Sequence, residues 1–161
     1  MNSFDPQSPL RKSGAVPAIL WGGLLCGVLD ITAAFVIYGR FGAAPVPLLQ
    51  GIAAGLLGPS ARQGGLATAA LGLFCHFVIA FSAATAYVLA SRRLRFLLQH
   101  FIASGVLYGV GVYFFMNRIV VPLSAARKYP FSFEMMVIGL VIHIFCVGLP
   151  IAIMTRCYTR I

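Results

Sequence analysis

The chain has 161 residues, of which 60% are hydrophobic and 9% charged, and its mean hydropathy is +0.95. Soluble domains carry charge on roughly a quarter of their residues, so this composition excludes an ordinary soluble protein. It predicts an all-α integral membrane protein, because helices satisfy their own backbone hydrogen bonds in lipid. The net charge of +9 does not indicate nucleic-acid binding, because the basic residues flank apolar stretches, where they would meet lipid headgroups.

In chain order, the sequence predicts a polar N-terminal tail over residues 1–16 and a single membrane domain over residues 17–161. The apolar run after the tail is too long for a signal-peptide core and contains Asp30, so we expect a retained first span. Apolar stretches that reach the length of about 20 residues needed to cross a bilayer predict an up-and-down four-helix bundle. The predicted spans are 17–39, 66–90, 98–121 and 134–155.

The connector between the first two spans is long and largely apolar. Its centre, residues 46–57, begins at Pro45 and Pro47 and ends at Gly58, which leaves it too short to cross a bilayer. Both an interfacial helix and a re-entrant hairpin agree with this pattern.

The basic residues near the span ends predict the orientation of the chain. Seven lie on the side of the N-terminus, the second connector and the C-terminus, and four lie on the other side, which predicts cytoplasmic termini. The first group is Arg11, Lys12, Arg92, Arg93, Arg95, Arg156 and Arg160, and the second is Arg40, Arg62, Arg127 and Lys128.

Two short motifs recur in matching spans. GxxxG occurs in the first span as Gly23 and Gly27 and in the third as Gly105 and Gly109, and these glycines are expected to line helix contacts. GLxxH occurs in the second and fourth spans as GLFCH and GLVIH. The pattern indicates two helical hairpins related as a parallel repeat.

The histidines of the repeated motif, His76 and His143, share one depth with Asp30. Each lies nine or ten residues from the assumed outer end of its span, about 13 to 15 Å at 1.5 Å per residue. An ionised Asp at that depth costs roughly 2.5 to 3.5 kcal/mol unless it has a partner, so we expect a buried polar layer with Asn117 and Arg118 above it. A pairing of Asp30 with Arg118 or a histidine that only fastens the helices is the alternative.

Two histidines at one depth could bind haem b axially, and together with Asp30 they could hold a metal ion. Interhelical hydrogen bonding is the alternative, and the small Ala80 and Ala84 on the face of His76 favour close packing. We expect no cofactor and no catalytic residues, because the sequence has no paired carboxylates, Ser–His–Asp set or phosphate loop. Without CxxC spacing, the cysteines are expected to be packing residues; they are Cys26, Cys75, Cys146 and Cys157.

A resemblance to a known group of proteins rests on two stretches of the chain, LLQGIAAGLLGPSARQGGLATAALGLFCHF and GVLYGVGVYFFMNRIVVPLS. The pattern resembles a group of small bacterial four-span membrane proteins with no assigned function, over most of residues 20–150. The resemblance implies a bacterial inner-membrane location and a self-contained four-helix unit, and it carries over no binding or catalytic residue.

These observations favour a membrane-embedded interaction or auxiliary subunit with a buried polar layer. The alternative is a minimal proton-linked transporter or permeation unit that acts as an oligomer and uses Asp30, His76 and His143. The expected partners are the lipid bilayer and either further copies of the chain or other membrane proteins.

Overall fold

The computed structural model describes residues 14–127 and 130–159, and the regular structure in these ranges is helical throughout. Four helical stretches in it are long and apolar enough to cross a membrane: Ala15–Arg40, Gly65–Arg93, Phe101–Leu123 and Phe133–Tyr158. The prediction of an all-α chain with four membrane-length helices is therefore confirmed. Most of the predicted tail, together with the basic residues Arg11, Lys12, Lys128 and Arg160, lies outside the described residues.

The helices follow one another with short connections. The first two spans are the single helices α1 (Ala15–Arg40) and α3 (Gly65–Arg93), with α2 (Pro45–Leu57) and a 3₁₀ segment, η1 (Gly58–Gln63), between them. After α4 (Phe96–Gln99), the third span consists of α5 (Phe101–Phe115), the π-helical η2 (Met116–Val120) and α6 (Val121–Leu123). The fourth consists of α7 (Phe133–Ile142), the π-helical η3 (His143–Gly148) and α8 (Leu149–Tyr158).

The third span begins at Phe101, three residues later than predicted. The backbone leaves the helical region at His100, where φ is −110° and ψ is 46°, and this residue separates α4 from α5. Hydropathy alone could not detect the break, because both sides of His100 are apolar.

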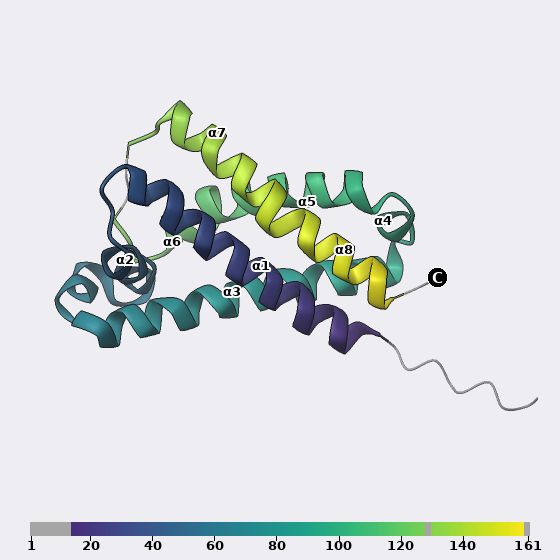
Figure 1. Ribbon diagram of the computed structural model, residues 1–161, viewed down its shortest axis with the longest axis horizontal. Coiled ribbons are helices and arrows are strands. Elements are labelled where there is room, and N and C mark those ends of the chain that lie inside the picture. The colour runs from purple at the N-terminus through teal and green to yellow at the C-terminus, as the bar shows by residue number, and fades with distance from the viewer. Residues whose placement is uncertain (1–13, 128–129, 160–161) are drawn as a thin grey trace, which may run out of the picture.

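The long helices lie alongside one another, and the chain turns back near α2, near α4 and before α7 (Figure 1). Helix α1 packs against α3 and also against η3 and α8, while α5 packs against η3 and α8. The start of α1 meets the end of α8, because a Cβ atom on Gly14 would collide with the carbonyl group of Tyr158.

The connector helix α2 lies against the first turns of α3 and is viewed nearly end-on in Figure 1, where α1 and α3 run across the view. The Gln50 amide Nε2 donates to the Gly65 carbonyl at 2.9 Å. The Ala125 N–H donates to the Gly55 carbonyl at 3.0 Å, which joins α2 to the loop that follows α6. Helix α2 is therefore fixed at both sides across one end of the molecule.

The interior combines many small side chains with a few large ones such as Tyr87 and Ile151. Cys26, Ala80, Ala84 and Ala152 are buried together in the main core, whereas many large apolar side chains, among them Leu107 at 71% exposure, point outward. In membrane proteins small residues allow helices to pack closely, and apolar surface is left for lipid. The many small side chains inside and the large apolar side chains outside match that arrangement.

The four GxxxG glycines lie at helix contacts. A Cβ atom on Gly23 or Gly27 would collide with the ring of Phe81 or Phe77 on α3. A Cβ atom on Gly109 would collide with backbone atoms of His143 and Ile144 in η3, and one on Gly105 would crowd the backbone of the same span. Each pair therefore faces the next membrane-length helix along the chain.

Candidate functional site

Asp30 on α1 and His76 on α3 face one another inside the helix set. The Asp30 carboxylate oxygen Oδ2 lies 4.0 Å from His76 Nδ1, and their side chains are 22% and 12% exposed. This separation suits an ion pair and exceeds the length of a direct hydrogen bond. The two helices meet here because Gly27, one turn before Asp30, allows α3 to approach closely.

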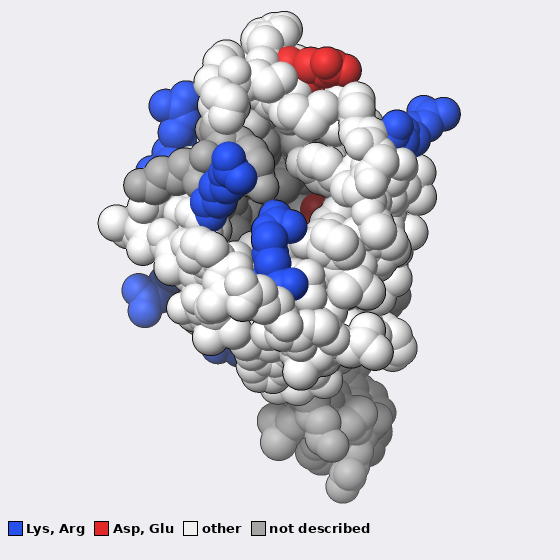
Figure 2. Space-filling view, turned by 90° about the vertical axis from the view of Figure 1, so that its left-hand side faces the viewer, with Lys and Arg blue, Asp and Glu red and all other residues white. Residues whose placement is uncertain are grey.

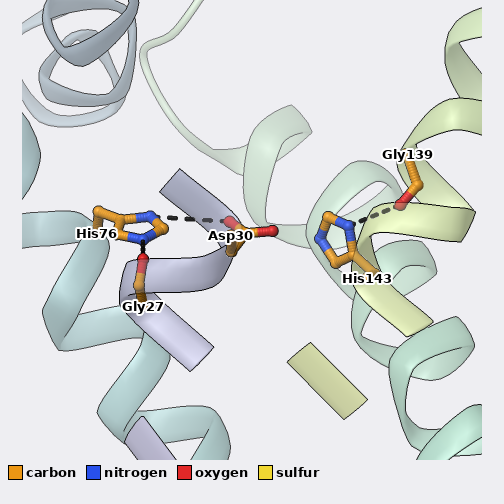
Figure 3. Close-up of polar contacts among 5 residues, drawn as sticks. All are labelled: Gly27, Asp30, His76, Gly139 and His143. Carbon is orange, nitrogen blue, oxygen red and sulfur yellow. Dashed lines mark hydrogen bonds and ion pairs between the residues drawn. The ribbon is translucent and has the colours of Figure 1, made fainter. Parts of the chain in front are cut away.

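The other ring nitrogen of His76 is also engaged. His76 Nε2 lies 2.9 Å from the carbonyl oxygen of Gly27 (Figure 3). A carbonyl can only accept, so Nε2 must carry the hydrogen. In the neutral ring Nδ1 then holds a lone pair, and that lone pair faces the Asp30 carboxylate.

His143 is held by its own helix. Its Nδ1 lies 2.9 Å from the Gly139 carbonyl oxygen, so Nδ1 is the protonated nitrogen of the neutral ring. The Tyr113 ring of α5 packs edge-on against it, with centroids 5.3 Å apart and an interplanar angle of 82°. Gly139 makes room for that ring, because a Cβ atom there would collide with Tyr113.

Figure 3 shows the Asp30 carboxylate between the two imidazole rings, with the free edge of His143 turned toward it. The repeated GLxxH motif therefore brings both histidines toward one carboxylate. The histidines are not equivalent, because His76 bonds to a neighbouring helix and His143 to the preceding turn of its own span.

Sequence reasoning missed Tyr38 and Tyr113 and expected Cys26 and Cys146 to be packing residues. Asp30 lies within electrostatic range of Cys26, Tyr38 and Cys146, and Tyr38 lies within range of Tyr113. Spacing offered a signal, since Tyr38 follows Asp30 by two helical turns on one face. Likewise Tyr113 lies one turn from Gly109 and one turn from Asn117.

The two residues expected above the layer do not join it. The Asn117 amide Nδ2 donates to the Tyr113 carbonyl at 2.9 Å, so it satisfies its own helix. Arg118 is exposed, and no ion pair links it to Asp30 within residues 14–127 and 130–159. Both residues lie in the π-helical segment η2, none of whose residues is buried.

A hollow leads into the molecule from the end that carries α2. Figure 2 views this end and shows an acidic side chain in the depth of the hollow, with Lys or Arg side chains beside it. Of the two acidic residues that the structure describes, Glu134 is exposed and Asp30 is partly buried. Asp30 is thus the acid that lies at depth in this hollow.

The donor set was also tested for a metal ion. Among residues 14–127 and 130–159, no three His, Cys, Asp or Glu side chains lie close enough together to hold one.

In the neutral ring, the orientation of His76 places the lone pair of Nδ1 opposite the Asp30 carboxylate. With no proton on the facing atoms, a lone pair of His76 opposes a buried anion, an arrangement that is costly in low dielectric. One proton gives either imidazolium with carboxylate or imidazole with carboxylic acid, and both are neutral overall.

The chain was also compared with known proteins. No protein-family model, no curated protein and no solved structure matches it.

Proposed function

We propose that this protein is a small integral membrane protein that binds and releases a proton within the bilayer, as a minimal proton-linked transport or permeation unit. The observation that carries the proposal is the contact between Asp30 and His76, in which the Gly27 carbonyl fixes which ring nitrogen meets the carboxylate. Buried ionisable groups inside membrane helices often mark ion or proton pathways.

Histidine changes charge near neutral pH, so it can take and return a proton under physiological gradients. His143 faces the same carboxylate from the opposite helix, and the hollow at the α2 end gives access from one side. Proton transfer from the hollow to Asp30, and between Asp30 and the histidines, is the step that we assign to these residues.

We further propose that the four spans form an up-and-down bundle made of two hairpins in a parallel repeat. The support is that GxxxG of α1 faces α3, while GxxxG of α5 faces η3. The location that we propose is the bacterial inner membrane, with both termini in the cytoplasm, and the support is the distribution of basic residues over the sequence. Helix α2 would then lie in the interface, in keeping with its end-on orientation relative to α1 and α3.

One observation favours the second candidate function, a membrane-embedded auxiliary subunit. The span Phe101–Leu123 is the least buried of the four, so much of its surface is open to a partner helix or to a second copy. In that role the Asp30–His76 pair would act as a pH-sensitive contact between helices.

The first test measures proton flux into liposomes that hold the purified protein, driven by a potassium diffusion potential and followed by an internal pH dye. Wild type is expected to take up protons faster than protein-free vesicles, and Asp30→Asn is expected to fall to the protein-free rate. Glu134→Gln is the matched control, because it removes an exposed carboxylate at the start of α7, and it should retain the wild-type rate. Equal rates for wild type and Asp30→Asn would exclude the transport role.

The second test separates transport from proton binding alone. Infrared spectra recorded across a pH titration should show a carboxylic acid band that is absent from Asp30→Asn. His76→Ala and His143→Ala should each alter the titration, with non-additive effects in the double variant because they share one partner. Titration of Asp30 without proton flux would favour the auxiliary subunit over the transporter.

A further inference from the structure

The polar layer presents hydrogen-bond acceptors from α1, α3 and η3. In neutral His76 the Gly27 carbonyl holds the hydrogen on Nε2, so the lone pair of Nδ1 faces the Asp30 carboxylate. In neutral His143 the Gly139 carbonyl holds the hydrogen on Nδ1, and Figure 3 shows the other nitrogen of this ring on the edge that faces Asp30. An ionised carboxylate can only accept. With both rings neutral, the facing atoms of these three side chains are therefore all acceptors.

With His76 neutral, the Asp30–His76 pair carries one negative charge. The groups within electrostatic range of Asp30 include the thiols of Cys26 and Cys146 and the Tyr38 phenol, and such groups are ordinarily uncharged at neutral pH. A carboxylate inside a membrane-length helix is costly unless its charge is matched. One bound proton matches the charge of this pair, and so does one small cation.

The gap between Asp30 and His76 has the width that a bridging donor requires. Asp30 Oδ2 and His76 Nδ1 lie 4.0 Å apart, too far for a direct hydrogen bond. Two N–H groups on one ammonium nitrogen, each about 2.9 Å from its acceptor, hold the two acceptors roughly 4.7 Å apart. The observed separation is close to that span, so a modest rotation of either side chain admits the nitrogen. A water molecule would also bridge the two atoms, but it would leave the charge of the carboxylate unmatched.

Both side chains of the pair can be reached from outside. Asp30 is 22% exposed and His76 is 12% exposed. Figure 2 shows the acidic side chain in the depth of the hollow at the α2 end, and this acid is Asp30. A cation that enters through this hollow and replaces a proton leaves the net charge of the pair unchanged.

We propose that the polar layer binds a small cation with N–H donors, ammonium or a primary alkylammonium, between the Asp30 carboxylate and His76 Nδ1. His143 offers a second neutral acceptor on the other side of the carboxylate. This inference rests on the proposed proton-linked function and supplies the class of its cargo. The cation and the proton use the same atoms, so one leaves as the other binds.

The experiment titrates the full chain, labelled with nitrogen-15 at its histidines, with methylammonium in micelles. The pH is mildly alkaline, so that the imidazoles are neutral and methylammonium keeps its charge, and about 0.15 M sodium chloride screens the Lys or Arg side chains beside the mouth of the hollow. We expect a saturable shift of the His76 Nδ1 signal, because this nitrogen accepts an N–H of the cation. Tetramethylammonium has the same charge and no N–H group, so it should leave the signal unchanged.

Two variants locate the site. Asp30→Asn removes the charge and should weaken methylammonium binding, measured on the same signal, by roughly tenfold or more, since a hydrogen bond to a charged group is lost. Glu134→Gln is the matched control, because it removes an exposed carboxylate outside the layer, and it should bind as the wild type does. The melting temperature of each variant shows whether it is folded.

An equal shift with tetramethylammonium would overturn the proposal, because N–H donors would then be irrelevant. The absence of any shift in the folded wild type, or an unchanged affinity in folded Asp30→Asn, would overturn it as well. Proton flux into liposomes without methylammonium binding would remove this inference and leave the proposed function standing. Methylammonium binding without proton flux would support the cation site and exclude the transport role.

Discussion

His76 and His143 end the same five-residue motif, yet their surroundings give them different tasks. His76 on α3 forms a hydrogen bond with the Gly27 carbonyl on α1, and this bond links the two helices. The same bond also determines which ring nitrogen of His76 carries the hydrogen. The bond of His143 returns to Gly139 in its own span and ties no second helix. His76 is therefore the histidine that both fastens the fold and faces the carboxylate at a defined distance.

The two tautomers are expected to be opposite once the rings are neutral. In His76 the hydrogen should reside on Nε2 and in His143 on Nδ1, because in each ring that nitrogen donates to a carbonyl. Nitrogen-15 NMR of histidine-labelled protein in micelles at alkaline pH measures this directly, with signals assigned by His76→Asn and His143→Asn. His100 is exposed and serves as the internal reference for an unrestrained ring. An Nδ1–H signal for neutral His76 would contradict the proposed arrangement.

At the scale of the elements, the two GxxxG glycine pairs make different contacts. Gly23 and Gly27 make room for the phenylalanine rings of α3, which can adjust their torsion angles. In the third span Gly109 lies directly against the backbone of η3, which cannot move aside without shifting the helix. The π-helical turn places His143 at this contact, and such turns are frequent at functional sites.

Alanine substitution is expected to separate these contacts. Gly109→Ala should lower the free energy of unfolding in detergent by about 1 to 3 kcal/mol, because the new methyl group meets backbone atoms. Gly27→Ala should cost less, about 1 kcal/mol, since the Phe77 ring can rotate.

The control for this series is Gly111→Ala, because nothing lies within 4 Å of a Cβ atom there. It should be neutral or stabilising by up to roughly 1 kcal/mol, the difference in helix propensity between alanine and glycine. A Gly109→Ala variant as stable as Gly111→Ala would remove the packing argument for the third span.

At the scale of the whole molecule, the two ends of the described chain meet. Gly14 before α1 lies against Tyr158 at the end of α8, so the start of α1 and the end of α8 lie at the same end of the helix set. The hollow above Asp30 opens at the opposite end.

This arrangement predicts a definite topology. Alkaline phosphatase, which is active only in the periplasm, should be inactive when it is fused after Ile161 or before Met1, because the basic residues favour cytoplasmic termini. A fusion in the loop between α6 and α7 should be active and serves as the control. Activity in only one of the two terminal fusions would place the termini on opposite sides of the membrane and would contradict this topology. Activity in both would place both termini in the periplasm.

The candidate site residues could be picked out from the sequence because placing an ionisable side chain in lipid costs free energy. Asp30 and the two histidines stand out against apolar stretches, and counting residues along each span gave them one depth. Arg118 is harder to place from the sequence, since a long basic side chain near a span end can point either inward or outward. In the structure it is exposed and lies in the π-helical segment η2.

The sequence by itself determined that the chain is all-helical with four membrane-length spans, because hydropathy and length act locally along the chain. The tertiary structure alone decided which ring nitrogen meets Asp30 and that Tyr113 packs on His143. These outcomes depend on how helices approach one another, and that approach is set by steric contacts between residues far apart in the sequence. Such contacts leave no periodic signal, which is why the kinds of residue could be predicted and their pairing could not.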